Sequence, residues 1–313
     1  MTEHPDRRPL VSIIVPSFNQ GRYIRETIES CLNQSYRPLE VLVFDGGSTD
    51  ETVAVLESLA APELRWWSAR DKGVVDAVNK GLRLARGEIL SIQSSDDLFV
   101  AGAIEAATTA ISAEPGLGLV FGDVEHIDEN SHITGRDVQG AFDLAAYLGR
   151  LSYVPQPGTF FTRRALLDVG EWSDKCSYAA DAHFWMRIAT RFPVRKLDQV
   201  VARYRYHADQ RDTQSARIAR DWQIAVLDIV ARGDLTNRQR RHAMMGINLA
   251  QYRYAPEADW LGRTLSLYAA VLKNPTALLD PRFPKRELLP GRTPIWSFLS
   301  GCKRRIGLTQ RGQ

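Results

Sequence analysis

Acidic side chains follow two hydrophobic runs in the first half of the chain. Asp45 comes directly after the apolar residues 41–44, and Asp96 and Asp97 come shortly after the run 89–92. A carboxylate at the end of a buried strand is costly unless a ligand or a cation needs it. In an open α/β sheet, this end of the strands borders the crevice in which ligands bind. One carboxylate could bind a base or a ribose, whereas a second, paired site suggests a divalent cation and a diphosphate.

The interpretation of Asp45 as a ligand contact has to be weighed against a structural role in the turn that begins at this residue. The sequence DGGSTDET contains two glycines that would let a ligand approach the backbone closely. Ser48 and Glu51 match a capping box for a helix over residues 49–60. Because this pair would satisfy the start of the helix, Asp45 is not needed there, and we interpret it as a ligand contact.

The turn after the first hydrophobic run bears on whether the ligand is a dinucleotide. A nicotinamide-binding domain needs G-x-G-x-x-G at this place. Residues 16–21 read Pro-Ser-Phe-Asn-Gln-Gly, so no glycine lies where a pyrophosphate would approach. Pro16 and Asn19 are common turn residues and are also placed to contact a ligand. Without a glycine cradle a diphosphate needs a cation, and the adjacent Asp96 and Asp97 exceed what one helix cap requires.

Alternating strand and helix signals must position these side chains. Apolar runs predict strands, and helical periodicity predicts the helices between them. The alternation implies βαβ units and a mainly parallel sheet. Strands are predicted over residues 11–15, 39–45, 64–69, 88–93 and 116–123, and helices over 23–33, 49–60, 74–85 and 99–112.

The second half of the chain is more mixed. A helix is predicted over residues 179–192 and a strand over 194–207. Residues 215–273 read as helical, and five prolines predict an extended tail over the last forty residues. The predicted fold class is therefore α/β, Rossmann-like with a mainly parallel central sheet, followed by a helical C-terminal extension.

Composition limits the class of protein. With 44% hydrophobic and 25% charged residues, the 313-residue chain is expected to be soluble and globular. A net charge of +3 is too small to predict binding of nucleic acid. Three widely spaced cysteines, Cys31, Cys176 and Cys302, indicate neither a disulfide framework nor a zinc site. We recognise no signal peptide and no membrane-spanning run, so we expect a cytoplasmic protein.

Three segments together resemble a known family. VSIIVPSFNQ, LEVLVFDGGSTDET and DKGVVDAVNKGLRLARGEILSIQSSDD are similar to family 2 inverting glycosyltransferases of the GT-A fold. The resemblance covers residues 10–210 and implies a GT-A catalytic domain over 1–210, with a donor half (10–123) and an acceptor half (124–210). Residues 211–313 would form the helical extension and a basic tail. The family implies a nucleotide-diphospho-sugar donor, a glycan or lipid-linked acceptor, and Mg²⁺ or Mn²⁺.

The resemblance also implies roles for residues of the first half. Ser94 stands where the family's D-x-D motif has its first carboxylate, so metal binding would rest on Asp96 and on Asp97. Val78 replaces an Arg that precedes the pocket Asn in many relatives, so the pyrophosphate would need another partner, such as Lys72 or Lys80. The residues implied in donor binding are Pro16, Asn19, Asp45, Asp71, Gly73, Asn79 and Asp96, with Gly81 in the same matching segment.

The second half would supply the catalytic base. Asp181 stands at the family's catalytic Asp, with Ala180 in place of a neighbouring Glu. A helix N-terminus favours an ionised carboxylate there, although Asp181 could also be only a first-turn residue. Arg205 and His207 match a late Arg-x-His segment, which implies that Arg205 contacts the donor and His207 the metal; the alternative is a strand edge with snorkelling arginines. Gln156 is the candidate for contact with the acceptor.

The end of the chain suggests a partner of another kind. Its aromatic and basic side chains, in the sequence IWSFLSGCKRRIGL, suit an anionic membrane surface, so we expect peripheral contact at the inner face of the membrane. An apolar stretch docked on the catalytic domain is the other interpretation. Two other functions stay open for the whole chain, which are a non-catalytic nucleotide-sugar-binding module and a sugar nucleotidyltransferase.

Overall fold

The computed structural model describes residues 7–208, 210, 215–256 and 258–288. The chain divides into two compact units. The first, the α/β unit, comprises Met1–Phe142 and Tyr153–Gln210. The second, the helical unit, comprises Asp143–Ser152 and Arg211–Gln313. The short segment Asp143–Ser152 thus groups with the helices, although it lies within the range 124–210 expected to belong to the α/β domain.

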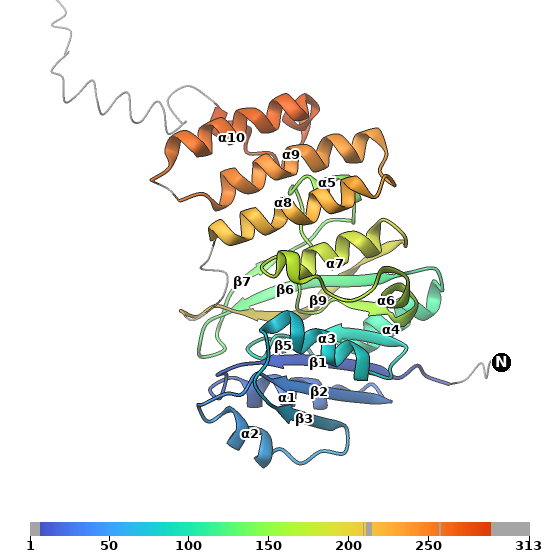
Figure 1. Cartoon of the computed structure of the whole chain (residues 1–313). Coiled ribbons are helices and arrows are strands. Elements are labelled where there is room, and N and C mark those ends of the chain that lie inside the picture. The colour runs from blue at the N-terminus through green and yellow to red at the C-terminus, as the bar shows by residue number, and fades with distance from the viewer. Residues whose placement is uncertain (1–6, 209, 211–214, 257, 289–313) are drawn as a thin grey trace, which may run out of the picture. The chain divides into compact units, whose positions relative to one another are not determined.

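A single nine-stranded sheet forms the centre of the α/β unit (Figure 1). Its order is β3-β2-β1-β4-β8-β6-β9-β5, with β7 paired to β6. The strands are β1 (Val11–Ser17), β2 (Leu39–Asp45), β3 (Leu64–Ser68), β4 (Ile89–Ile92), β5 (Leu98–Phe99), β6 (Leu119–Ile127), β7 (Ile133–Asp137), β8 (Phe160–Thr162) and β9 (Val194–Arg205).

The sheet is mainly parallel, as predicted. β2 and β4 pair in parallel with β1, β3 pairs in parallel with β2, and β9 pairs in parallel with β6. β8 lies antiparallel between β4 and β6, so these two strands share a direction. Six of the nine strands therefore run one way, and their carboxyl ends lie along one edge of the sheet.

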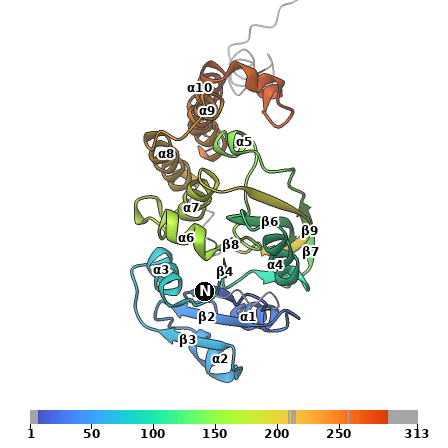
Figure 2. The same ribbon diagram turned by 90° about the vertical axis from the view of Figure 1, so that its right-hand side faces the viewer.

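Helices cover both faces of this sheet. Figure 2 shows α3, α6 and α7 on one side and α1 and α4 on the other. The helices of this unit are α1 (Ile24–Leu32), α2 (Thr52–Ser58), α3 (Val74–Leu84), α4 (Ala103–Ala113), α6 (Arg163–Val169) and α7 (Ala180–Ala189), with a short 3-10 helix η1 (Asp174–Cys176).

Packing follows the alternation of side chains along the strands. Ile13 and Val15 of β1 join the core beneath α1 and α4. Ile14 points to the other face, where a Cβ at Gly81 of α3 would come within 2.3 Å of its side chain. Glycine at this position therefore lets α3 pack directly on β1. This contact with the sheet fixes the position of α3, which begins three residues after Asp71.

The helical unit has its own core. It contains α5 (Leu144–Leu148), α8 (Ser215–Ala231), α9 (Asn237–Tyr254) and α10 (Trp260–Lys273), then the 3-10 helices η3 (Pro275–Leu279) and η4 (Lys285–Leu288). Thr236 and Gln239 form a capping box that starts α9. Leu249 and Leu267 pack in a buried cluster between α9 and α10. Within the described part of the chain, we find no helix long and apolar enough to cross a bilayer.

Three local predictions were wrong in whole or in part. The helix after Asp45 begins at Thr52, and its N-cap residue Glu51 makes no capping hydrogen bond; Asp50 accepts from the N–H of Thr52 instead. The helix expected from residue 99 begins at Ala103, because the two residues of β5 pair with β9. The expected extended tail is in part helical at η3 and η4, and residues 289–313 lie outside the described residues.

Candidate active site

Asp45 holds the turn at the carboxyl end of β2. Its Oδ2 accepts hydrogen bonds from the N–H groups of Gly47 (3.1 Å) and Ser48 (2.9 Å) and from the hydroxyl of Ser68 (2.6 Å). The hydroxyl of Ser48 donates to Oδ1. Asp45 therefore has a structural role, and the argument that the turn does not need it was wrong. Its carboxylate still lies at the strand end where a ligand is expected.

The loop after β1 is tied to the same turn. Asn19 adopts a positive φ of 52°, its N–H donates to the Ser48 hydroxyl (2.7 Å), and its Oδ1 accepts from the N–H of Thr49 (2.9 Å). Pro16 lies in β1, opposite Phe44 of β2. The structure thus brings three of the predicted donor residues, Pro16, Asn19 and Asp45, to neighbouring strand ends.

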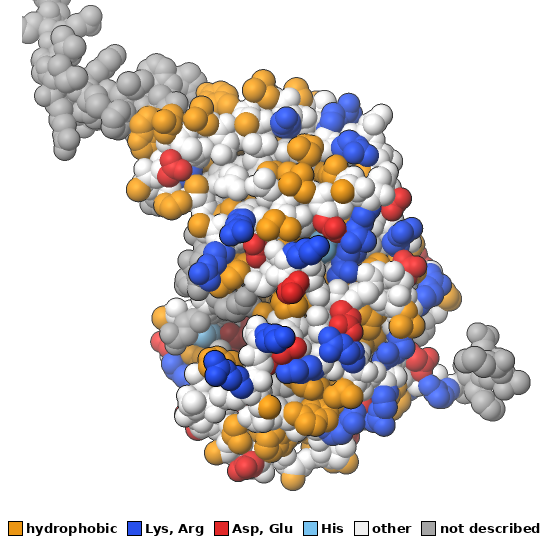
Figure 3. All heavy atoms as spheres, viewed as in Figure 1, with side chains coloured by type: hydrophobic (Ala, Val, Ile, Leu, Met, Phe, Trp, Pro, Cys, Tyr) orange, Lys and Arg blue, Asp and Glu red, His pale blue; other side chains and the backbone are white. Residues whose placement is uncertain are grey.

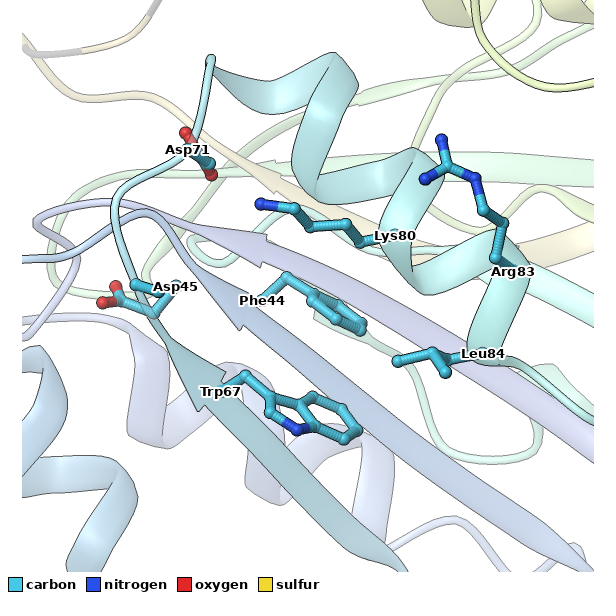
Figure 4. A pocket seen from close by; sticks show the side chains of 8 residues that line it. Phe44, Asp45, Trp67, Asp71, Lys80, Arg83 and Leu84 are labelled. Atoms are coloured by element: carbon cyan, nitrogen blue, oxygen red, sulfur yellow. The ribbon is translucent and has the colours of Figure 1, made fainter.

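A cavity of about 380 Å³ opens beside Asp45 (Figure 4). This size is within the range of pockets that hold small organic ligands. The rings of Phe44 and Trp67 stack on its floor, with centroids 4.9 Å apart. Its lining residues are Phe44, Asp45, Trp67, Ala69, Asp71, Lys80, Arg83 and Leu84. The cavity therefore combines an apolar floor, two carboxylates and two cations.

Asp71 and Asp45 meet at this cavity, although β3 separates them in the sequence. Asp71 Oδ1 accepts from the N–H of Gly73 (2.7 Å), which starts α3 with a positive φ of 102°. A Cβ at Gly46 would lie 3.0 Å from the Asp71 carboxylate. Glycine at position 46 therefore allows the close approach that brings the two acidic residues to one wall.

Asn79 has a different place from the one predicted. Its side-chain Nδ2 donates to the carbonyl of Trp172 (3.0 Å), and its Oδ1 accepts from the N–H of Trp172 (2.9 Å). Asn79 does not line the cavity. Next to it on α3, Arg83 forms an ion pair with Glu171 at 2.8 Å. These contacts join α3 to the segment that leads into α7.

Asp96 and His207 come together after β4 and β9. His207 Nε2 lies 2.9 Å from Asp96 Oδ2, and its side chain is almost fully buried against the ring of Tyr23. The Asp96 side chain keeps a 16% exposed fraction. Two side chains that can bind a divalent cation are thus adjacent, and one of them reaches the surface.

Arg205 is fully buried and bonds to the protein. Its Nε donates to the Asp96 carbonyl (2.8 Å), and its NH2 group forms an ion pair with Glu26 at 2.7 Å. Its NH1 group donates to the Asp128 carbonyl and to Ser131. The predicted contact between Arg205 and the donor is therefore not evident in this arrangement, in which the side chain fixes the loop that carries Asp96.

Asp97 differs from Asp96 in its surroundings. Its side chain is fully buried, and Oδ1 accepts from the backbone N–H of Arg205 (2.9 Å). Burial, followed by the nearby charge of Asp96, raises the pKa of Asp97 well above its usual value. Among the described residues, no three His, Cys, Asp or Glu side chains cluster as a complete metal site. The adjacent pair of Asp96, which reaches the surface, and the nearly buried His207 suits a cation completed by substrate phosphates.

Gln156 lies beside the end of β4. Its Oε1 accepts from the Ser94 hydroxyl (2.7 Å), and its Nε2 donates to the Ile92 carbonyl (2.5 Å). Ser94, which replaces the first carboxylate of the motif, is thus held by the residue predicted to meet the acceptor. The segment that contains Gln156 and the Asp96 loop are fixed to each other.

Asp181 lies in the first turn of α7 and is partly exposed. The N-cap residue Ala179 supplies no side-chain hydrogen bond, so the N–H groups of this turn favour a negative charge nearby. Phe184 and Trp185 anchor the helix against Phe161 of β8. Asp181 does not line the cavity beside Asp45.

Sequence reasoning missed several residues of the site. Trp67 was assigned only to a strand, although its place one residue before the end of β3 puts it at the ligand edge. Ser48 and Ser68 were not recognised as the hydroxyl donors to Asp45. Arg83 belongs to no sequence motif, and the only indication of its place in the site was a positive charge in the last turn of the helix that became α3.

The family assignment follows from a comparison with known proteins. The model of the family described as "Glycosyl transferase family 2" matches residues 12–170, which run from the second residue of β1 past the end of β8 and include the residues that line the cavity. The chain belongs to glycosyl transferase family 2. The family predicted from the sequence is confirmed.

Relatives of this glycosyl transferase family 2 chain carry matching names. It is 24% identical over 255 residues to a chondroitin synthase of Escherichia coli, covering 80% of this chain and 35% of that protein. It is 32% identical over 192 residues to an uncharacterized glycosyltransferase, MT1564, of Mycobacterium tuberculosis, covering 58% of this chain and 69% of that protein. The chain thus spans about a third of the length of the first of these relatives.

Solved structures share the fold of this family 2 chain. Staphylococcus aureus TarS 1–349 in complex with UDP-GlcNAc matches with a TM-score of 0.63 and 16% identity, covering 96% of this chain and 93% of that one. The mannosyltransferase PcManGT of Pyrobaculum calidifontis, in complex with GDP-Man and Mn²⁺, matches with a TM-score of 0.61 and 21% identity, covering 97% and 89%. The predicted GT-A fold with a helical C-terminal extension is confirmed.

Proposed function

We propose that this family 2 chain transfers a sugar from a nucleotide-diphospho-sugar donor to a hydroxyl group of a glycan or lipid-linked acceptor, with inversion at the anomeric carbon. The observation that carries the proposal is the cavity at the carboxyl ends of β2 and β3, where Asp45 and Asp71 meet. Its walls suit a nucleoside, because carboxylates accept N–H and O–H groups of a base and a ribose, and aromatic rings offer an apolar floor.

The diphosphate would lie between this cavity and the Asp96 loop. Asp96 and His207 are the residues that would hold Mg²⁺ or Mn²⁺, and the cation would offset charge on the departing nucleotide diphosphate. We leave Asp97 out of this set, because its carboxylate is fully buried and bonded to the backbone of Arg205. The complex of the related mannosyltransferase with GDP-Man and Mn²⁺ supports a role for a cation.

Asp181 acts as the base in this proposal. Its carboxylate takes the proton of the acceptor hydroxyl, whose oxygen attacks the anomeric carbon as the bond from that carbon to the phosphate oxygen breaks. The leaving diphosphate keeps the electron pair of this bond. General-base assistance of this kind contributes about 10²–10⁴ in rate. Gln156, beside Ser94, is our candidate for contact with the acceptor.

Two residues that were predicted to bind the donor are given a structural role in the proposal. Asn79 and Arg205 position other groups, because the amide of Asn79 is bonded to Trp172 and the guanidinium of Arg205 is fully buried. Contact with a membrane through residues 292–313 stays a prediction, since that segment lies outside the described residues.

The remaining alternative is a module that binds nucleotide sugars without chemistry. Ser94 and Ala180, which replace acidic residues of the family pattern, favour this alternative. The third hypothesis, a sugar nucleotidyltransferase, loses support because the family model that matches the chain is that of the glycosyl transferases.

One experiment separates these functions. Thermal unfolding is followed with UDP-, GDP- and dTDP-sugars, each with and without Mn²⁺, because a ligand that binds the folded state raises the melting temperature. Release of nucleotide diphosphate is then measured with the donor that stabilises. An enzyme releases the diphosphate, and release is lost in Asp181→Asn. Stabilisation without release by the wild type, in the presence of varied acceptors, would favour the binding module.

A further inference from the structure

One face of α10 presents an apolar stripe to solvent. Leu261, Leu265, Tyr268 and Leu272 are all exposed, and their spacing of four, three and four residues places them on one side of the helix. The opposite side is buried, with Thr264, Leu267 and Ala270 in contact with the rest of the helical unit. Figure 3 shows hydrophobic side chains gathered over α10.

The stripe contains no charge. Residues 260–273 include no acidic residue, and their two cations are Arg263 and Lys273. Arg263 lies over the ring of Tyr252, 5.2 Å from its centroid, on the side of the helix that packs against α9. Leu272 is 82% exposed and Leu279, in the following η3, is 83% exposed. Contiguous apolar surface of this kind marks an interaction site rather than ordinary surface variation.

Cations gather where the stripe ends. Lys273, Lys285 and Arg286 are exposed, and none of the three forms an ion pair with a residue that the structure describes. Lys285 Nζ lies 3.5 Å from the carbonyl of Leu278, beside the exposed Leu279. Beyond residue 288 the sequence adds five more Lys and Arg residues and no acidic residue.

We propose that the face formed by Leu261, Leu265, Tyr268, Leu272 and Leu279, with Lys273 and Lys285 at its end, docks on an anionic lipid surface. Apolar side chains enter the boundary between head groups and acyl chains, and the cations meet the lipid phosphates. An anionic lipid surface would complement the cations at the end of this face, and pairing of the face with a second copy of the chain is the competing outcome that the test separates. This inference concerns binding and does not depend on the proposed reaction.

The test uses the full-length protein and vesicles of known composition. Binding is measured by cosedimentation with vesicles of phosphatidylglycerol and phosphatidylcholine, and with vesicles of phosphatidylcholine alone. Leu265→Gln with Leu272→Gln removes half of the α10 stripe and keeps good helix formers. The expected result is wild-type binding to the anionic vesicles that falls by about tenfold or more in this double variant.

A matched control replaces an exposed leucine elsewhere. Leu167→Gln on α6, where the side chain is 76% exposed, is expected to bind the anionic vesicles as the wild type does. Lys273→Gln with Lys285→Gln is expected to weaken binding and to reduce its dependence on salt. Thermal unfolding checks that each variant folds; if the double variant does not, Leu272→Gln alone replaces it.

Three results would overturn the proposal. The first is a wild type that does not bind anionic vesicles, and the second is a double variant that binds them equally well. The third is a wild type that forms dimers in light scattering while the double variant is monomeric, with vesicle binding the same in both. That third outcome would assign the face to self-association.

Discussion

The side-chain amide of Asn79 forms two hydrogen bonds with the backbone of Trp172, one through Nδ2 (3.0 Å) and one through Oδ1 (2.9 Å). The two residues are 93 positions apart in the sequence. This pair joins α3, which borders the cavity, to the segment that precedes Asp181. Together with the ion pair between Arg83 and Glu171, this amide links the helix that borders the cavity to the segment that carries the proposed base.

Asn79→Ala should lower the free energy of unfolding by about 1–3 kcal/mol, because it leaves two partly buried backbone groups of Trp172 without partners. Urea denaturation measures this change. If Asn79 contacted the donor instead, the variant would weaken binding of the nucleotide sugar and leave the stability nearly unchanged. Arg70→Ala, an exposed position outside these contacts, serves as the control.

Asp181→Asn should reduce kcat by about 10²–10⁴ and leave the Kd of the donor nearly unchanged, because the amide cannot take the acceptor proton. Single-turnover kinetics and calorimetry measure the two quantities. Asp174→Asn, at an exposed position in the preceding η1, is the matched control and should keep normal turnover. Near-normal turnover in Asp181→Asn would remove this residue from the reaction.

His207→Gln should weaken Mn²⁺-dependent binding of the donor by about tenfold or more, because loss of a ligand or of its neighbour lowers metal affinity by about 10–100-fold. Calorimetric titration with and without Mn²⁺ checks this. His132→Gln, at an exposed histidine paired with Asp128, should behave as the wild type. A donor affinity that does not respond to Mn²⁺ in the wild type would contradict the assignment of Asp96 and His207.

Because of Glu40, the stability of the α/β unit should depend on pH in the acid range. Burial alone would raise the pKa of Glu40, but hydrogen bonds from the Ser12 hydroxyl and from the backbone and guanidinium of Arg86 outweigh it, and the pKa is lowered. A folded-state pKa below the unfolded value of about 4.3 stabilises the protein above that pH, and this contribution is lost as the pH falls through the folded-state pKa.

Glu40→Gln should therefore lower the free energy of unfolding by about 2 kcal/mol at neutral pH, and by less in acid. Urea denaturation across this pH range measures the difference between the variant and the wild type. A difference that does not shrink below pH of about 4 would show that the charge of Glu40 is not what stabilises the fold.

Much of the α/β unit could be predicted because its signals are local. The runs that form β1, β2 and β4 are apolar enough to indicate buried strands, and parallel strands place their following loops at one edge. Asp45 and Asp96 could therefore be assigned to that edge from the sequence. The exposure of each side chain and its hydrogen-bond partners could not be predicted from the sequence.

The errors share one cause, which is contact between distant segments. Ser48 looked like a helix cap, yet its hydroxyl accepts a hydrogen bond from the N–H of Asn19, 29 positions earlier in the chain. The two residues of β5 are too few to show periodicity, and β9 decides their conformation. Arginines are usually exposed, so nothing local indicated that Arg205 is fully buried.

The burial of Arg205 has a consequence for the order in which the protein can be completed during synthesis. Its Nε reaches the Asp96 carbonyl across 109 positions of the chain, and β5 pairs with β9, which ends at this arginine. The first strands and helices leave the ribosome long before that residue does. The contacts between Arg205 and the loop that carries Asp96 can form only when β9 is in place, so an arrested chain that ends before residue 194 would contain the acidic motif with the bonds of Gln156 and without those of Arg205.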